Sequence, residues 1–176
     1  MDPQSFLKEY ITTYLDFPEE GTIFRDIVPL LRNPTAFSHA IICIKNNIRL
    51  FSDSPDVIVA PEATGFLFGA PVAFQLKLPF VPVRKPSKLP GEVIEQSYAL
   101  EHGEAVLNIP ANSIKPDDKV VIINDLLATG NTFQAIANLV EKMGGKVIHI
   151  ACLIELVDLH GRDFLQKYDV SSVLTF

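Results

Sequence analysis

Cysteine is scarce in this chain, and the segments that would direct a protein out of the cytoplasm are lacking. The 176 residues include two cysteines, Cys43 and Cys152, which stand in apolar runs without CxxC or metal-ligand spacing. This excludes a disulfide framework and predicts two buried, reduced thiols. The N-terminus lacks the basic and apolar regions of a signal peptide, and no apolar run approaches the ~18 residues of a membrane span. We therefore expect a cytoplasmic protein with no membrane partner.

The chain also lacks an excess of basic residues, since its formal net charge is −6. Nucleic acids and acidic membranes bind basic surfaces, so neither is expected as a partner. A small anionic ligand stays open, because it needs only a local pocket of donors. Hydrophobic residues make up 48% of the chain and charged residues 20%, which is typical of a globular protein. The length suits one domain.

No internal repeat, low-complexity segment or linker divides the chain, and short apolar runs alternate with helical patterns. Asn33-Pro34 is typical of a helix N-terminus, and apolar residues follow at helical spacing, so 35–50 is predicted as an amphipathic helix. Weak alternation over 92–108 indicates an exposed hairpin or flap. The other expected elements are strands at 57–60, 80–83, 120–123, 147–154 and 170–174, and helices at 3–14, 65–77 (apolar on all sides and therefore buried), 133–143 (ended by Gly144-Gly145) and 161–168.

The predicted strands have no polar face, which indicates that helices cover both faces of the sheet. Such sheets are mainly parallel. The fold class expected is therefore α/β, a single domain with a mainly parallel central sheet flanked by helices. Ligands bind at the carboxyl ends of the strands in sheets of this kind. We expect the loops after Ala60, Val83 and Ile123 to face a common site.

Residues 120–132 carry the strongest functional pattern, because they run from a buried strand through Asn-Asp-Leu-Leu-Ala-Thr-Gly-Asn-Thr into a helix. Backbone N–H groups at a helix N-terminus suit a phosphate. Thr129 and Thr132 add hydroxyl donors, and Gly130 permits close backbone approach. Asp125 is anionic, so it suits sugar hydroxyls instead. The absence of a Walker A lysine and of GxGxxG argues against an ordinary nucleotide or dinucleotide loop, and a capped helix without a ligand is the structural alternative.

The same segment resembles the phosphoribosyl-diphosphate signature of type I phosphoribosyltransferases, in which two acidic residues precede a Leu-Leu-Ala-Thr-Gly-Gly-Thr-like loop. Further blocks are similar to the adenine phosphoribosyltransferases, in the same order and along nearly the whole chain. These blocks are Phe17-Pro, Gly21-Thr-Ile-Phe-Arg-Asp-Ile, Gly65-Phe-Leu-Phe-Gly69, Val81-Pro-Val-Arg-Lys-Pro86, Lys88-Leu-Pro-Gly91 and Tyr98-Ala-Leu-Glu-His-Gly103. Because several independent blocks agree, we interpret the chain as a member of this family.

The resemblance implies transfer of the 5-phosphoribosyl group from phosphoribosyl diphosphate to adenine, which gives AMP and diphosphate in purine salvage. Mg²⁺ is the implied cofactor, held mainly by substrate oxygens without a dedicated protein ligand. The implied assembly is a homodimer. Within the single domain of residues 1–176, the resemblance implies an N-terminal hood that binds the base at about 1–34 and a flexible flap at about 92–108.

The site residues implied by the resemblance fall into four sets and one catalytic group. Glu101 is the implied general base that takes the N9 proton of adenine. Without the resemblance, Glu101 and the basic segment are alternatively solvated loop residues, and Phe24 a core residue. The sets are Ala128, Thr129, Gly130, Asn131 and Thr132 for the 5′-phosphate; Asn124 and Asp125 for the ribose; Glu62, Ala63, Thr64, Arg84, Lys85 and Lys88 for the diphosphate; and Ile23, Phe24, Arg25 and Leu126 for adenine.

Four positions depart from the family pattern. Asn124 replaces the first acidic residue of the signature, Asn131 its second loop glycine, Thr64 an arginine and His102 a tyrosine. Asn131 is expected to keep the loop shape, because asparagine tolerates left-handed backbone. A lost charged contact costs about 1.5–3 kcal/mol, so we expect an enzyme that is active but of reduced efficiency. The alternatives are a weakened paralogue that acts as a nucleotide-binding sensor or regulator, and a phosphoribosyltransferase for another purine.

Overall fold

The computed structural model describes residues 3–51, 54–99 and 103–176. The chain forms two compact units, 1–43 and 44–176, and each is described by itself. Helix α3 (Pro34–Phe51) spans the boundary between them. The predicted division into a hood, a core and a flap stays a prediction.

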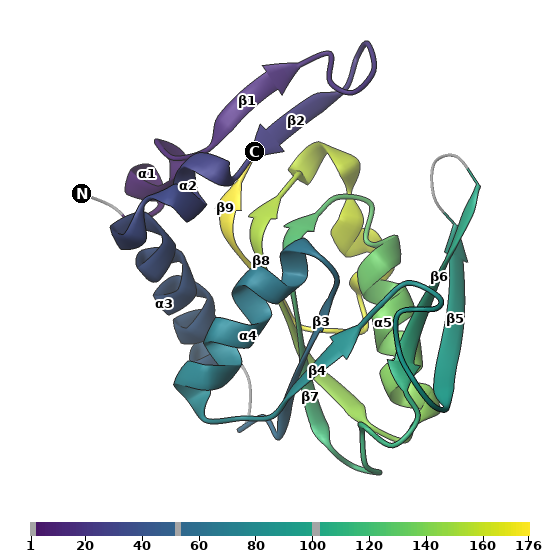
Figure 1. Cartoon of the computed structure of the whole chain (residues 1–176). Coiled ribbons are helices and arrows are strands. Elements are labelled where there is room, and N and C mark those ends of the chain that lie inside the picture. Colours follow the sequence, from purple (N-terminus) through teal and green to yellow (C-terminus); the bar gives the residue numbers. More distant parts are fainter. Residues whose placement is uncertain (1–2, 52–53, 100–102) are drawn as a thin grey trace. The chain divides into compact units, whose positions relative to one another are not determined.

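A five-stranded parallel sheet forms the centre of the second unit (Figure 1). All of its neighbouring strands pair in parallel register, as the apolar runs predicted. Each predicted strand is present, and β7 extends four residues further than expected. The strand order is β4 (Phe80–Val83), β3 (Val57–Pro61), β7 (Lys119–Leu127), β8 (Lys146–Glu155) and β9 (Val170–Thr175).

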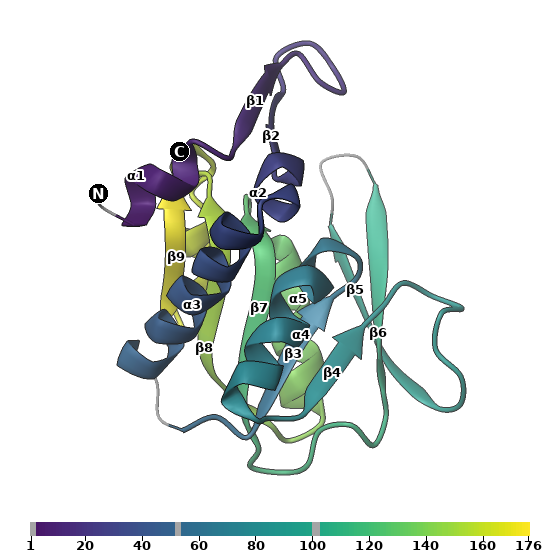
Figure 2. The ribbon, with the colours of Figure 1, turned by 60° about the vertical axis from the view of Figure 1, so that its left-hand side comes forward.

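Two helices cover opposite faces of this sheet, α4 (Thr64–Leu76) and α5 (Asn131–Lys142), as Figures 1 and 2 show. Alternate residues of the central strands point to opposite faces. Ile122 therefore joins the buried cluster of Phe133 and Ile136 on the α5 side, whereas Ala60 meets α4 at Gly69, where an added Cβ would lie 2.7 Å from the Ala60 Cβ. The sheet is thus buried on both faces and leaves its carboxyl edge for ligands.

The predicted hairpin is confirmed as an antiparallel pair, β5 (Val93–Ala99) and β6 (Glu104–Pro110). It is not exposed throughout, because one face packs into the core cluster that contains α5. Leu107 and Ile109 are buried there, and Tyr98 is partly buried against them. The hairpin therefore rests on α5 as a third layer.

The first unit contains α1 (Pro3–Lys8), the antiparallel pair β1 (Thr12–Leu15) and β2 (Ile23–Asp26), α2 (Val28–Arg32) and the start of α3. The side chain of Asn33 caps α3, since its Oδ1 accepts hydrogen bonds from the Thr35 and Ala36 backbone N–H groups, each at 3.0 Å. The cap confirms the helix start that Asn33-Pro34 predicted.

Four sequence-based expectations need correction. The helix predicted at 3–14 ends at Lys8 because its second half pairs with β2 as strand β1. The helix predicted at 161–168 is the short 3-10 helix η2 (Gly161–Leu165). Helix α4 is not buried on all sides, since Phe74 is 85% exposed. Cys152 is buried as predicted, but Cys43 is only half-buried; both are free thiols.

Candidate functional site

The loops that follow β3, β4 and β7 meet at the carboxyl edge of the sheet, as predicted. The turn between β7 and α5 encloses a cavity of about 210 Å³. Because β7 runs on to Leu127, the predicted ribose residues are strand residues and the turn itself is only Ala128–Gly130. The cavity is lined by Asn124, Asp125, Leu126, Ala128, Thr129, Gly130, Thr132 and Phe133.

Gly130 provides the sharp turn from strand to helix, with a φ of 87° that favours glycine. Asn131 is the first residue of α5 and does not have a positive φ. The tolerance of asparagine for left-handed backbone is therefore not needed at Asn131, because the turn is completed one residue earlier, at Gly130. The backbone N–H groups that begin α5 lack partners within the helix and form the positive end of its dipole.

Asp125 is half-buried at the end of β7, where its side chain accepts a hydrogen bond from the Thr64 hydroxyl. Burial raises the pKa of the Asp125 carboxyl above its ordinary value, and hydrogen bonds from Thr64 and from the backbone N–H groups of Asp125 and Leu126 oppose that shift. Thr64, predicted for the diphosphate, thus contacts the predicted ribose carboxylate.

The two asparagines that depart from the family pattern both use their amide groups. Asn124 Nδ2 donates to the Leu126 carbonyl at 3.3 Å, so it stabilises the end of the strand. Asn131 Nδ2 donates to the Ala99 carbonyl at 3.2 Å, which joins the start of α5 to the end of β5. Each bond needs an N–H donor that a carboxylate or a glycine lacks.

Glu62 organises the predicted diphosphate residues. Its Oε1 accepts the Lys85 backbone N–H at 2.7 Å, and its Oε2 pairs with Arg84 Nε at 3.2 Å. These hydrogen bonds, the Lys85 bond first, hold the pKa of the Glu62 carboxyl below its ordinary value. Arg84 also donates to the Lys88 carbonyl at 3.2 Å. The structure therefore brings the basic segment together around Glu62, with the Lys85 and Lys88 side chains exposed.

Sequence reasoning missed Gly161, which packs against the turn. A Cβ on Gly161 would lie 2.2 Å from the Ala128 carbonyl oxygen, and one on Gly130 would lie 2.5 Å from the Gly161 carbonyl oxygen. Only the absence of both side chains permits this approach. The glycine after His160 was the sole sequence signal, and it names no contact partner.

The predicted adenine residues fall in both units. On β2, Ile23 and Phe24 are exposed, and Phe24 packs edge-to-face with Phe17 at 5.3 Å between ring centroids. Arg25 Nη1 hydrogen-bonds the Thr13 hydroxyl. Leu126 belongs to the second unit, so a common adenine pocket stays a prediction. Glu101 and His102 lie outside the described residues, and their predicted roles stay predictions.

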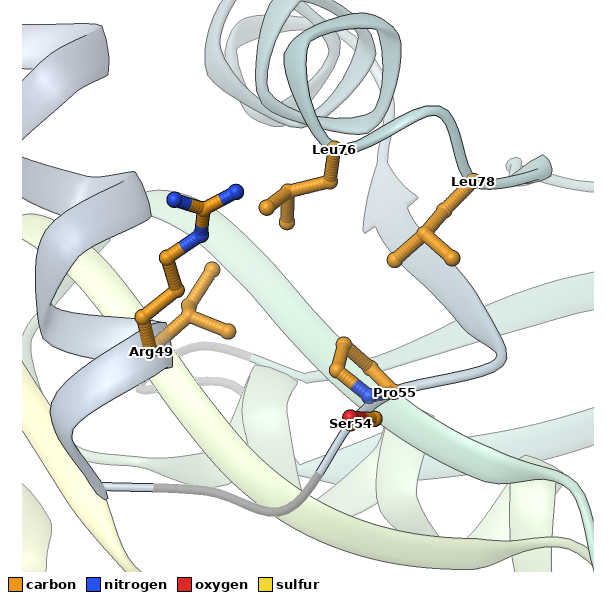
Figure 3. A pocket seen from close by; sticks show the side chains of 6 residues that line it. Arg49, Ser54, Pro55, Leu76 and Leu78 are labelled. Atoms are coloured by element: carbon orange, nitrogen blue, oxygen red, sulfur yellow. The ribbon is translucent and has the colours of Figure 1, made fainter.

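A second cavity of about 260 Å³ lies at the amino ends of β3 and β4, away from the predicted residues. Figure 3 shows Arg49 reaching toward Leu76, and the rest of the lining is Ile48, Ser54, Pro55 and Leu78. Among these residues Arg49 is the one charged side chain. The cavity therefore lacks the converging polar groups that mark the β7–α5 turn.

Over the described ranges, no group of three or more His, Cys, Asp or Glu side chains could hold a metal ion. No described helix is long and apolar enough to cross a membrane.

Comparison with known proteins places this geometry in a family. The phosphoribosyl transferase domain model matches residues 29–175. The chain is 48% identical to an adenine phosphoribosyltransferase of Thermosipho melanesiensis, over 99% of this chain and 98% of that protein. The solved structure of the Thermoanaerobacter pseudethanolicus enzyme of the same name superposes with a TM-score of 0.94 at 44% identity, covering 98% and 99% of the two chains.

A further solved structure carries ligands. It is the adenine phosphoribosyltransferase of Saccharomyces cerevisiae complexed with an imino-altritol bisphosphate and adenine, with a TM-score of 0.92, 36% identity, and coverage of 97% and 98%. The matches extend over nearly the full length of each chain, and the fold, the carboxyl-edge turn and the sequence blocks agree with them. The chain belongs to the adenine phosphoribosyltransferases of the phosphoribosyl transferase domain family.

Proposed function

We propose that this chain transfers the 5-phosphoribosyl group of phosphoribosyl diphosphate to N9 of adenine, which gives AMP and diphosphate in purine salvage. One observation carries the proposal: the β7–α5 turn, where the first backbone N–H groups of α5 have no partner within the helix, and the half-buried Asp125 line the same cavity. That cavity offers donors for a phosphate and an acceptor for sugar hydroxyls within the same few residues.

The phosphoribosyl group is proposed to bind along this turn. The backbone N–H groups of 129–132 and the hydroxyls of Thr129 and Thr132 would hold the 5′-phosphate. Asp125 would accept hydrogen bonds from ribose hydroxyls. As the bond from C1 to diphosphate breaks, positive charge develops on the ribose, and the nearby carboxylate stabilises it. The N9–C1 bond then forms, and the N9 proton leaves to a base.

The diphosphate is proposed to lie beside the loops that follow β3 and β4. Arg84, Lys85 and Lys88 supply positive charge there, and Glu62 holds Arg84 in place through its 3.2 Å contact. Mg²⁺, when bound, offsets the negative charge of diphosphate and helps it leave. The residues present fit an ion whose ligands come mainly from substrate oxygens, because no described group of three or more His, Cys, Asp or Glu side chains could hold a metal and Glu62 is already paired.

Adenine is proposed to stack on Phe24, with Ile23, Arg25 and Leu126 around it. The exposed ring of Phe24 and the edge-to-face support from Phe17 favour this assignment. Glu101 is proposed as the general base for N9. Both assignments rest on the family resemblance of their motifs.

A cytoplasmic homodimer is the proposed assembly. Helix α4 exposes Phe74, at 85%, and Leu67, at 38%, two turns apart on the same side. Water-exposed aromatic surface of this kind favours contact with a partner. The net charge of −6 and the apolar exposure together suit a second copy of the chain better than nucleic acid.

The test is formation of AMP from adenine and phosphoribosyl diphosphate with Mg²⁺, followed across a panel of purines. Adenine is expected to react in preference to hypoxanthine and guanine. No turnover above a control without enzyme would reject the proposal, and preference for another purine would reject its substrate assignment. Thr64→Arg and Asn124→Asp in the same assay show whether the departures limit the rate.

A nucleotide-binding sensor of low activity is the second candidate. Glu62 already accepts hydrogen bonds from Arg84 Nε and the Lys85 backbone N–H, so these two donors must exchange partners if they are to hold diphosphate themselves, whereas the exposed Lys85 and Lys88 side chains need no exchange. Calorimetric binding of AMP together with an absence of turnover would support the sensor over the enzyme.

A further inference from the structure

Asn131 touches two parts of the candidate site at once. It is the first residue of α5 and directly follows Gly130, the last residue of the turn that lines the cavity. Asn131 is not among the residues that line the cavity, and its Nδ2 donates to the Ala99 carbonyl at 3.2 Å. Ala99 is the last residue of β5 and pairs with Glu104 of β6, so the bond reaches the tip-facing end of the hairpin.

The other hairpin contacts of this kind lie further from the cavity. Lys142, the last residue of α5, donates from Nζ to the Glu95 carbonyl at 3.1 Å. Helix α5 therefore holds β5 by one side-chain bond at each of its ends. Of these two bonds between described residues, that of Asn131 is the one beside the turn, because Lys142 lies three turns away along the helix.

We propose that Asn131 is a positioning residue that couples occupation of the turn by a phosphate to the position of the end of β5. The inference rests on the proposed function, in which the turn binds the 5′-phosphate. A phosphate held by the N–H groups of the turn restrains Asn131, and its amide then restrains the Ala99 carbonyl. Because the turn and the Ala99 carbonyl are both ordered through Asn131, they share the entropy cost of ordering that residue. Ordering of one therefore favours ordering of the other.

The coupling has a consequence for the reaction. Residue 101, proposed as the general base, follows Ala99 by two positions in the sequence. Loss of the Asn131 amide is expected to lower kcat and to raise the KM for phosphoribosyl diphosphate, because the coupling acts in both directions between the phosphate site and the end of β5. The net contribution of a typical hydrogen bond corresponds to about a five-fold change in an equilibrium constant.

The test compares the unaltered chain with Asn131→Ala and Asn131→Gly by hydrogen exchange of residues 93–99, with and without ribose 5-phosphate. Ligand is expected to slow this exchange in the unaltered chain by about five-fold, and to change it little in both variants. Calorimetry is expected to find ribose 5-phosphate affinity lowered by up to about five-fold in both variants, because coupling between two sites is reciprocal. The glycine variant repeats the test with no side chain at all.

Lys142→Ala is the matched control, because it removes the other α5 to β5 side-chain bond. In this variant, hydrogen exchange of residues 93–99 should be faster than in the unaltered chain both with and without ribose 5-phosphate. Addition of ribose 5-phosphate should still slow that exchange. Equal slowing in the Asn131 variants and the unaltered chain would overturn the coupling alone. No binding of ribose 5-phosphate to the unaltered chain would overturn the proposed function, and the coupling with it.

Discussion

Thr64 shows how one residue takes a role that its sequence position does not reveal. The family pattern has a cation there, and the sequence suggested only a lost diphosphate contact. In the structure the Thr64 hydroxyl donates to Asp125, whose burial already raises the pKa of its carboxyl. The hydroxyl favours the ionised carboxylate that sugar hydroxyls require.

Thr64→Val should move the acid limb of the kcat/KM profile to higher pH. Removal of the hydroxyl raises the pKa of Asp125 further, so the carboxylate is lost sooner as pH falls. The profile is measured with phosphoribosyl diphosphate as the varied substrate. Thr64→Ser keeps the hydroxyl and should keep the limb in place; equal shifts in both variants would contradict the role of the hydroxyl.

Gly161→Ala should both destabilise the chain and weaken phosphate binding. The added Cβ would lie 2.2 Å from the Ala128 carbonyl oxygen, and overpacking of this kind costs roughly 1–3 kcal/mol. Urea unfolding and ribose 5-phosphate calorimetry measure the two effects. Gly91→Ala is the control, because nothing lies within 4 Å of its added Cβ and only backbone strain follows; normal phosphate affinity in Gly161→Ala would contradict the packing argument.

The short helix η2 packs against the turn, and one ion pair holds η2 on the sheet. Arg162 Nε and Nη2 reach the two oxygens of Glu155, at 2.5 Å and 2.7 Å. Nη1 also donates to the Val170 carbonyl at 2.8 Å. Glu155 ends β8 and Val170 begins β9, so the pair ties η2 to the sheet. Gly161, next in the chain to Arg162, is thereby held against the turn.

Glu155→Gln should lower the free energy of unfolding by about 1–2 kcal/mol at neutral pH. Loss of one partner of a fully buried ion pair destabilises a protein by more than this. The Arg162 side chain is 47% exposed, so solvent screens its attraction to Glu155. The Arg162 hydrogen bond, first among its causes, holds the pKa of Glu155 below its ordinary value. The ionised Glu155 therefore stabilises the fold above the pKa of about 4.3 that this carboxyl has in the unfolded chain. This stabilisation is lost as pH falls through the lower pKa of the folded state.

Urea titrations from pH 7 to pH 3 check this pH dependence. The unaltered chain should lose more stability below about pH 4.3 than Glu155→Gln does. The control is Asp117→Asn, which breaks the fully exposed pair with Lys146 and should change neutral stability little. Identical acid slopes for the unaltered chain and Glu155→Gln would contradict a stabilising role for this carboxylate.

Assembly belongs to the scale of the whole molecule, and exposed apolar side chains are its main indication. Phe74 is 85% exposed on α4 although the segment is apolar enough to suggest full burial. The sheet covers one side of the helix only. The remaining apolar side therefore suits a partner surface.

Phe74→Glu should convert the proposed homodimer into a monomer in sedimentation velocity, because a charge placed in an apolar interface is costly to bury. Leu50→Glu is the control, since Leu50 is 76% exposed on α3 and carries no such proposal. An unaltered chain that is already monomeric, or a Phe74→Glu dimer, would contradict this assignment.

Much of the second unit could be predicted because its signals are local. The apolar runs around Val59, Ile122 and Ile150 predicted buried strands, and Gly144 marked the end of α5. In the first unit, Asn33 marked the start of α3. The prediction of a helix over residues 3–14 was wrong because only pairing with β2 makes their second half a strand. The prediction that the helix at 65–77 is buried on all sides was wrong at Phe74, because composition cannot tell which side of an apolar helix meets the sheet.

The sequence by itself determined the family, the parallel sheet and the position of the phosphate-type turn, since these follow from motif order and hydrophobic pattern within short segments. Only the tertiary structure decided that Thr64 contacts Asp125, that Asn131 reaches Ala99 and that Gly161 supports the turn. These contacts join residues 31 to 61 positions apart, and nothing local specifies them. They exist because parallel strands bring distant loops to one edge of the sheet.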